Sequence, residues 1–290
     1  MAVDFGDLDN LIPSEEKKDF SKMLSDSYVD PEEEIKPQPV AVSIGSSIYK
    51  NTSFAIPFGS YGDFSCIVGA SKSRKTFFKS MIVAGYIGGQ SNVLNPSIVG
   101  HKTKDKFVIE FDTEQSKFHT QRVVRRVCDM VGSNYNHYKT FSLRQYSPKE
   151  RFEFIDWIIY ESEFKENIGL ISIDGYVDLV TDFNSLEQAS GLTDKLLEWT
   201  AKGNMHITGI LHKNFGSAKP VGHVGSSVLK KAETVAFIDT DKETGFTEVK
   251  CEYSRNIPFK DLLFGVNDDW LPHEIQEGLI LPNNTNAIDF

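Results

Sequence analysis

The chain has 290 residues and a formal net charge of −10, from 31 Lys and Arg residues against 41 Asp and Glu residues. This excess of acid argues against a wholly basic nucleic-acid-binding protein, although it is compatible with a local basic groove. No apolar run reaches the roughly 18 residues that a membrane-spanning helix needs. The acidic N-terminus lacks the apolar segment of a secretory signal. The three cysteines show no disulfide or metal-ligand spacing, so we expect a reduced, cytoplasmic protein.

Residues 1–40 are expected to form an acidic, flexible tail and linker. They hold 11 acidic and 4 basic residues, and the stretch DPEEEIKPQPV at residues 30–40 contains three prolines. Apolar residues at positions 8, 11, 12, 20, 23 and 24 would allow one short amphipathic helix that docks on a replication partner. Disorder with brief helical turns is the favoured interpretation of this segment.

From about residue 41 the apolar pattern alternates between strands and helices. Strands are predicted at residues 65–69, 106–112, 169–174 and 206–211, and helices at 76–85, 116–131, 151–162 and 186–202. Two later strands, at 234–239 and 247–253, are joined by a polar turn. This order predicts an α/β fold with a mostly parallel central sheet, flanking helices and an antiparallel C-terminal hairpin. We expect this domain to span residues 41–268 and residues 269–290 to form a tail.

The strongest motif is a phosphate-binding loop with the sequence Gly69-Ala70-Ser71-Lys72-Ser73-Arg74-Lys75-Thr76. It follows a predicted strand and opens a predicted helix, so backbone N–H groups and the helix dipole would converge on an anion. Lys75 would contact the β- and γ-phosphates, and Thr76 would offer its hydroxyl to Mg²⁺. The motif normally has glycine where Arg74 stands, because the backbone there needs a positive φ or a close approach to phosphate. Arg74 therefore either adds a cationic phosphate contact or weakens nucleotide binding.

Carboxylates follow two of the predicted strands. Asp174 ends the strand LISID and is the candidate for holding the water shell of the metal, although Gly175 after it also suits a plain turn. Glu114 lies just beyond the strand that ends at Asp112, where open sheets bind ligands, and is the candidate for orienting the attacking water. Asp112 is the reserve candidate, and Glu110 fits a wall residue or a salt-bridge partner. An acid in the first turn of the next helix is the plainer interpretation of Glu114.

Five segments taken in order resemble the RecA-like P-loop ATPases: GASKSRKT, FDTE, LISIDG, GILHKN and GHVGSS. Within that group the chain looks closest to the branch that holds the DnaB-type replicative helicases and the plasmid RepA-type hexameric helicases. The resemblance covers about residues 45–265. It implies a motor that hydrolyses ATP with Mg²⁺ in the replication of a phage or mobile element. It also implies a homo-oligomer, in the form of a hexameric ring on single-stranded DNA.

The resemblance also implies a role for each matching residue. The loop from Gly69 to Thr76 binds the nucleotide, and the further roles fall to Glu114 as catalytic base, Asp174 and Thr76 at the metal, His212 as γ-phosphate sensor, Lys213 and Lys219 as DNA-contacting cations, and Arg255 as an arginine finger acting in trans. Plainer interpretations are a buried histidine for His212, solvated charges for the two lysines, and an intrachain salt bridge for Arg255. Tyr253 stands where the family often has a second basic residue.

Two other functions are compatible with the same motifs. One is a RecA- or RadA-like recombination or loader ATPase that coats or remodels DNA without unwinding it. The other is a nucleotide-binding regulatory protein whose hydrolysis is weakened by Arg74. The motifs do not indicate which nucleotide base is preferred.

Overall fold

The computed structural model describes residues 19–102, 105–213 and 222–275. The chain divides into two units, residues 1–37 and residues 38–290. The first unit contains the helix α1 (Ser21–Ser27), which buries none of its side chains. The possible amphipathic helix is therefore seven residues long where it is described, and the apolar positions 8, 11 and 12 lie outside the described residues.

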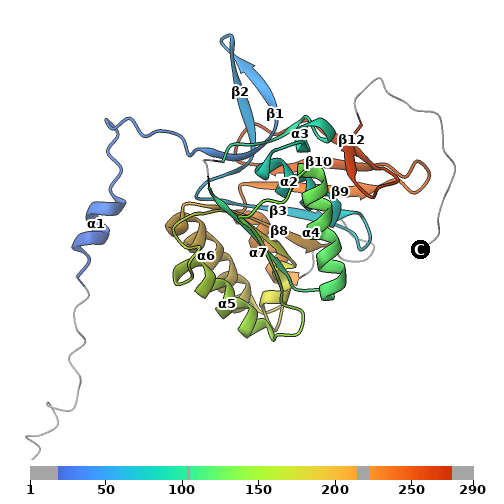
Figure 1. Cartoon of the computed structure of the whole chain (residues 1–290). Helices are drawn as coiled ribbons and strands as arrows, with labels where there is room; N and C mark the ends of the chain where they lie inside the picture. Colours follow the sequence, from blue (N-terminus) through green and yellow to red (C-terminus); the bar gives the residue numbers. More distant parts are fainter. Residues whose placement is uncertain (1–18, 103–104, 214–221, 276–290) are drawn as a thin grey trace, which may run out of the picture. The chain divides into compact units, whose positions relative to one another are not determined.

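The second unit is built on a large mixed sheet (Figure 1). Its strands are β3 (Phe64–Gly69), β5 (Phe107–Asp112), β6 (Tyr138–Ser142), β7 (Ile168–Asp174), β8 (His206–His212), β9 (Thr234–Thr240), β10 (Thr247–Ser254), β11 (Leu262–Val266) and β12 (Pro272–Glu274). They lie in the order β12-β11-β10-β9-β3-β8-β7-β5-β6. The strands from β9 to β6 in this order are parallel, and β10 to β12 add antiparallel pairs. The predicted α/β architecture is thus confirmed.

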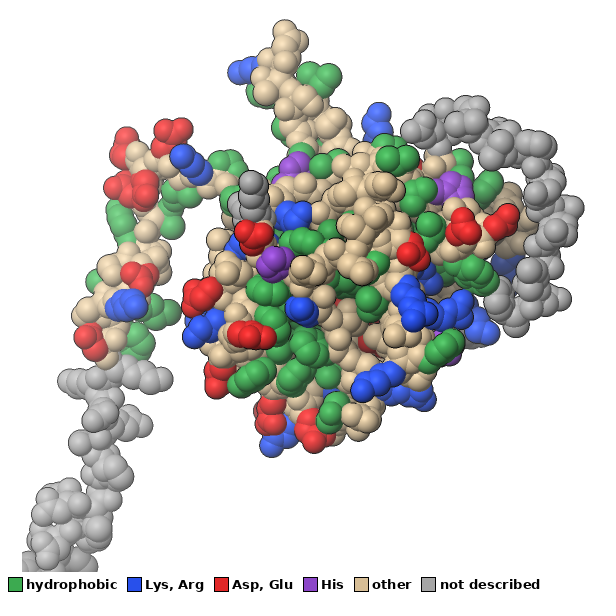
Figure 2. Space-filling model, viewed as in Figure 1, with side chains coloured by type: hydrophobic (Ala, Val, Ile, Leu, Met, Phe, Trp, Pro, Cys, Tyr) green, Lys and Arg blue, Asp and Glu red, His purple; other side chains and the backbone are tan. Residues whose placement is uncertain are grey.

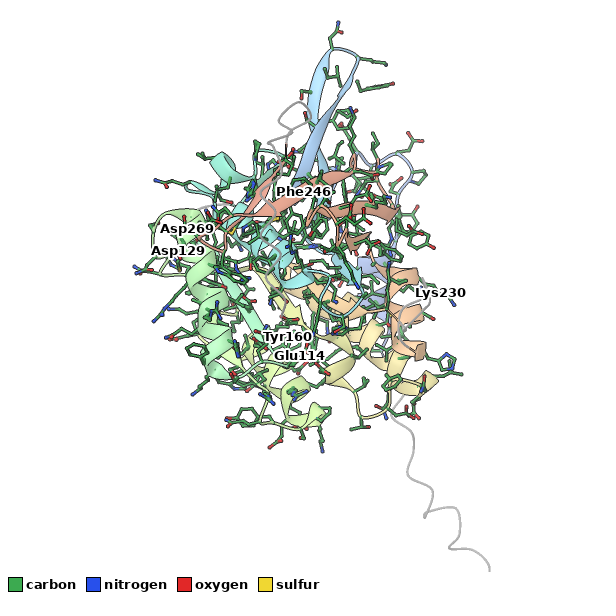
Figure 3. All side chains as sticks on the ribbon, turned by 90° about the vertical axis from the view of Figure 1, so that its right-hand side faces the viewer. Glu114, Asp129, Tyr160, Lys230, Phe246 and Asp269 are labelled. Atoms are coloured by element: carbon green, nitrogen blue, oxygen red, sulfur yellow. The ribbon has the colours of Figure 1, made fainter. Side chains whose placement is uncertain are left out.

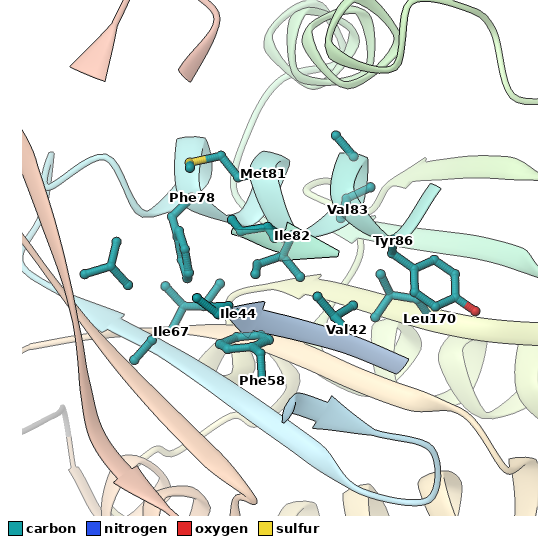
Figure 4. Close-up of a cluster of buried hydrophobic side chains, with 14 of the residues drawn as sticks. Val42, Ile44, Phe58, Ile67, Phe78, Met81, Ile82, Val83, Tyr86 and Leu170 are labelled. Atoms are coloured by element: carbon teal, nitrogen blue, oxygen red, sulfur yellow. The ribbon is translucent and has the colours of Figure 1, made fainter. Parts of the chain in front are cut away.

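Helices cover both faces of this sheet. They are α2 (Lys75–Ile87) and α4 (Lys117–Val131) on one face, and α5 (Pro148–Tyr160), α6 (Leu186–Gly203) and α7 (Gly222–Lys231) on the other. Successive strand residues point to opposite faces, so Ile67 of β3 joins the first core, whereas Cys66 and Val68 join the second. Figure 4 shows the side chains of α2 packed over the strands in the first core. Burial on both faces explains why the central strands are continuous apolar runs.

A separate three-stranded antiparallel sheet packs against α2. It consists of β1 (Val40–Tyr49), β2 (Thr52–Ser60) and β4 (Ile98–Gly100), with the short helix α3 (Ser91–Leu94) before β4. The first half of β1 is buried against α2, whereas Ile48 and Tyr49 at its far end are 75% and 65% exposed. The hairpin therefore projects from the unit (Figure 1). Sequence patterns did not predict it, because serines and irregular register interrupt the alternation of apolar residues.

The sequence patterns also did not predict β6, α7, β11 or β12. Strand β12 lies inside the segment expected to be a C-terminal tail and pairs with β11. Within the described residues, no helix is both long enough and apolar enough to cross a membrane.

Helix α5 begins three residues before the predicted start because its N-terminus is a complete capping box. The side chain of Ser147 accepts a hydrogen bond from the backbone N–H of Glu150. The side chain of Glu150 in turn accepts one from the backbone N–H of Ser147, and Pro148 occupies the first turn.

We expect Ser147→Ala to lower the free energy of unfolding by about 1 kcal/mol in urea titrations followed by circular dichroism, because the substitution removes this cap. Ser190→Ala, at an exposed position of α6, should change it by less than about 0.5 kcal/mol. Equal losses in the two variants would contradict the capping role.

Candidate nucleotide-binding site

The phosphate-loop sequence lies at the carboxyl edge of the sheet, where β3 passes into α2. Gly69 ends β3 and is paired with His212 of β8 and Ile238 of β9. A Cβ atom at Gly69 would lie 2.4 Å from Ser73 Oγ and 2.8 Å from the carbonyl oxygen of Ile238. No larger residue fits there, so glycine allows the loop to fold back over the end of its own strand.

Arg74 has the left-handed backbone conformation, with φ 62° and ψ 23°. This is the conformation for which the motif normally uses glycine. Its guanidinium Nη1 donates a hydrogen bond to the carbonyl oxygen of Gly245, in the turn between β9 and β10. The loop thus has the backbone conformation expected of the glycine-containing motif, and the arginine side chain is held by the neighbouring turn.

Lys75 opens α2 and is 6% exposed. Its Nζ donates to the carbonyl oxygens of Gly69, at 3.0 Å, and Ala70. Burial lowers the pKa of Lys75 to about 8, although the charges of Asp174 and Glu114 oppose this shift. Ser73 Oγ is also buried and has no hydrogen-bond partner among the described residues. Within the part of the chain that the structure describes, the buried ammonium thus contacts only carbonyl oxygens and lies beside a hydroxyl with no partner, a pair suited to binding a polyanion.

The loop borders a cavity of about 500 Å³, which is within the usual range for small-molecule sites. Its wall includes the loop from Ser71 to Thr76, together with Glu114, His119, Arg122, Arg126, Asp174, His212 and Trp270. Three of these side chains come from α4, and Figure 2 shows Lys and Arg side chains gathered beside this helix. The cavity is therefore electropositive on two sides, in a chain that is acidic overall.

Two aromatic contacts place arginines at this cavity. The guanidinium of Arg122 lies 5.9 Å from the ring centroid of Trp270, and that of Arg126 lies 3.8 Å from the ring of Phe77. Burial lowers the pKa of Arg126 to about 10, and its Nε and Nη1 atoms have no hydrogen-bond partner among the described residues. Neither arginine was predicted as a site residue, although the basic helix that carries them was recognisable from its sequence.

Asp174 ends β7 and is buried in an ion pair with a lysine that sequence analysis did not single out. Lys79 Nζ, one turn after Lys75 in α2, lies 2.8 Å from Asp174 Oδ2 and also contacts the carboxylate of Glu110 on β5. Burial lowers the pKa of Lys79, but the two carboxylates outweigh it and hold that pKa above its usual value. Glu110 is thus a salt-bridge partner, which is one of the two roles predicted for it from the sequence.

The carboxylate of Asp112 is bound within the protein by hydrogen bonds, whereas that of Glu114 lines the cavity. Asp112 Oδ1 accepts hydrogen bonds from the backbone N–H groups of Glu114 and Gln115, at 3.1 and 2.8 Å. Its Oδ2 accepts one from Thr120 Oγ1 at 2.8 Å, so this carboxylate is committed to the turn that leads into α4. The side chain of Glu114 is 62% exposed, and its Oε2 lies 3.7 Å from Nε2 of His212 (Figure 3 labels Glu114). Of the two acids, only Glu114 presents its carboxylate to the cavity.

The interaction with His212 also sets the charge of Glu114. The nearby side chain of His212 lowers the pKa of the Glu114 carboxyl most, with smaller contributions from the charges of Lys75 and Lys79, while burial opposes them. Glu114 is therefore held as a carboxylate at the edge of the cavity.

Of the two lysines predicted to contact DNA, the structure describes only Lys213. Lys213 follows β8, and its backbone N–H donates to the carbonyl oxygen of Gly69. Its Nζ lies 4.7 Å from the ring centroid of Phe237. Lys219 lies outside the described residues.

Arg255 lies at the opposite edge of the sheet from the phosphate loop. It follows β10, whose last residue, Ser254, pairs with Thr234 at the start of β9, and its Nη1 lies 2.9 Å from Oδ2 of Asp63, just before β3. The six residues of β3 separate this point from the loop by roughly 20 Å. The intrachain salt bridge is thus present, and Arg255 does not reach the loop of its own chain.

The residues present fit a magnesium ion held together with phosphates. Mg²⁺ is usually bound through one or two carboxylates and substrate phosphates rather than by an all-protein cage. Among the described residues, no cluster of three or more His, Cys, Asp or Glu side chains forms such a cage. Asp174 and Thr76 both line the cavity beside the phosphate loop and supply the carboxylate and hydroxyl oxygens that this mode of binding uses.

This loop, at the carboxyl edge of a mixed sheet with helices on both faces, defines a protein with the RecA-like P-loop fold. Among the solved structures that share the fold is that of the RadB recombinase, with a TM-score of 0.52 and 15% sequence identity over 76% of this chain and 93% of that chain. At this identity the similarity concerns the fold alone. No protein-family model matches the sequence, and no curated protein matches it. The RecA-like fold is thus confirmed, and the placement in the DnaB and RepA branch stays a prediction.

Arg74 allows a direct test of the loop conformation. Arg74→Gly and Arg74→Ala both remove the guanidinium and its hydrogen bond to Gly245, but only alanine has a Cβ that disfavours a positive φ. We expect Arg74→Gly to be more stable than Arg74→Ala by about 1 kcal/mol in chemical denaturation. Equal stability of the two variants would show that residue 74 does not hold this conformation in solution.

Proposed function

We propose that the chain is an ATPase that binds ATP with Mg²⁺ at residues 69–76 and acts on DNA in the manner of RecA- or RadA-like recombination or loader proteins. The observation that carries the proposal is the buried Lys75 beside the unpartnered Ser73 hydroxyl, at the mouth of a cavity that also presents Asp174 and Glu114. The similarity to the fold of a recombinase favours this function over the helicase predicted from the motifs.

The proposed roles follow from where the side chains lie. Lys75 neutralises the β- and γ-phosphates, and Thr76 and Asp174, the latter through water, hold Mg²⁺, which supplies charge stabilisation on the phosphates. Glu114 orients the attacking water as general base, because its carboxylate is ionised and exposed to the cavity. Its neighbour His212 ends β8, so this histidine is placed to relay the state of the phosphates to the segment that begins at Lys213.

The base is proposed to lie against Arg122 and Trp270. The guanidinium of Arg122 lies 5.9 Å from the ring centroid of Trp270 at the wall of the same cavity, and planar guanidinium and indole groups are the kind of group on which a purine stacks. Lys213 and Lys219 are proposed to contact the DNA backbone.

The backbone conformation of Arg74 argues against the alternative function, a regulatory protein with weakened hydrolysis. That alternative rested on distortion of the loop by a residue other than glycine. Because Arg74 takes φ 62° and is tied to Gly245, the loop conformation gives no reason to expect weak phosphate binding. An active ATPase is therefore the proposal that the loop supports.

Two substitutions test the catalytic assignment. We expect Lys75→Ala to weaken nucleotide binding, measured by calorimetry, at least about tenfold, since a charge-assisted hydrogen bond contributes roughly 1.5–3 kcal/mol. Glu114→Gln should bind nucleotide normally and lower the rate of ATP hydrolysis at least about 100-fold. Lys149→Ala, at an exposed position of α5, is the matched control and should change neither quantity.

The same assays separate the competing functions. Hydrolysis that survives both substitutions would refute the assigned site. Stimulation of the wild-type rate by single-stranded DNA, falling as salt rises, supports the DNA-associated ATPase, and a rate indifferent to DNA favours a regulatory protein. Unwinding of a forked duplex would support the helicase branch in place of a recombinase or loader.

Arg255 is proposed to act on the nucleotide of a neighbouring copy in a homo-oligomer, for which a hexameric ring remains the predicted form. Arg255→Ala and Glu114→Gln should each be inactive alone, and mixing them should restore hydrolysis, because the first variant keeps the site and the second keeps the arginine. Asp63→Asn removes the ion-pair partner but leaves the arginine, so it should stay active. Failure of the mixture to regain activity would refute the role in trans.

A further inference from the structure

We propose that Lys79 and Glu110 form a fixed charge balance around Asp174 that keeps the affinity of the nucleotide-free site for divalent cations low. The metal then binds together with the phosphates rather than ahead of them. This inference rests on the proposed function, and it assigns Lys79 and Glu110 as positioning residues for Asp174.

The ammonium group of Lys79 is enclosed between the two carboxylates. The side chain of Lys79 is 1% exposed, and those of Glu110 and Asp174 are 2% and 4% exposed. The Nζ atom of Lys79 lies 2.8 Å from Oδ2 of Asp174, and Asp174 also lines the cavity. The carboxylate at the cavity is thus already paired with a cation of the protein itself.

Glu110 limits how strongly this internal cation acts. Its carboxylate contacts the same ammonium group from β5 and also accepts a hydrogen bond from the hydroxyl of Tyr138 on β6. The side chain of Glu110 is 2% exposed, so its carboxylate is held beside the Lys79 ammonium and shares that charge with Asp174. The charges of Asp174, Glu110 and Lys79 sum to −1. Lys79 contacts both carboxylates, so its positive charge is shared between them.

A divalent cation at Asp174 would lie within a few ångströms of the Lys79 ammonium. Repulsion at that distance, even with the effective dielectric of a protein interior, changes affinity by at least about tenfold. Phosphates add negative charge to the same place and overcome this repulsion. A purely structural role, in which Lys79 only joins α2 to the sheet, makes no such prediction about metal affinity.

Two variants shift the charge balance in opposite directions. Glu110→Gln leaves Lys79 paired with Asp174 alone and should weaken the binding of Mn²⁺ to nucleotide-free protein at least about threefold. Lys79→Met combined with Glu110→Gln keeps the net charge of the group at −1 but removes the cation, and should tighten Mn²⁺ binding at least about tenfold. Electron paramagnetic resonance of free Mn²⁺ measures both shifts. Lys149→Met, on the surface of α5, is the control and should bind Mn²⁺ as the wild type does.

Opposite shifts in the two variants support the proposal, since a loss of packing would not move metal affinity in two directions. Unchanged Mn²⁺ affinity in folded variants, judged by thermal melting, would overturn it. If the double variant does not fold, Glu110→Gln decides alone, and an affinity equal to that of the wild type overturns the proposal. Wild-type protein that fails to bind Mn²⁺–ATP would refute the proposed function itself, whereas normal Mn²⁺–ATP binding with unshifted variants would refute only the charge balance.

Discussion

The ammonium group of Lys79 joins three elements of the fold, because it bridges α2 to carboxylates on β5 and β7. Buried charges of this kind are tolerated only as a complete set, and removing one partner costs about 3–5 kcal/mol because the remaining charges lose their compensation. The bridge therefore fixes α2 in one position over the sheet. Since α2 begins where the phosphate loop ends, the same contact fixes the loop relative to Asp174.

The order of the strands determines which side chains meet. Strands β3, β8, β7 and β5 are neighbours in this order in the sheet. Their carboxyl ends carry Gly69, His212, Asp174 and Asp112, respectively, and Glu114 lies in the turn after β5. Parallel strands place all these ends at one edge, the position at which open sheets bind ligands. Apolar cores on both faces keep the strands fixed, so the phosphate loop and the turn that carries Glu114 both start from buried strand ends.

Much of the fold could be predicted because the central strands are buried on both faces and read as continuous apolar runs. The β1–β2 hairpin and β6 lack such a signal, since their residues are partly exposed and polar. At the site, the loop and the two strand-end acids were recognisable from spacing. The pairing of Lys79 with Asp174 was not, because the two residues are 95 positions apart and meet only through the packing of α2. Likewise, only the hydrogen bonds of Asp112 distinguish it from Glu114 as a free carboxylate.

The place of Arg255 has a consequence for symmetry. This arginine lies beside Asp63 at the amino edge of the sheet, and the phosphate loop lies at the carboxyl edge. Two copies related by a two-fold axis could serve each other only reciprocally, with each arginine at the other copy's loop, and such a pair is closed. In the predicted ring each copy instead offers its arginine to the next copy only, so the contacts are head to tail. Such contacts repeat from copy to copy until they close into a ring or continue as a helical filament.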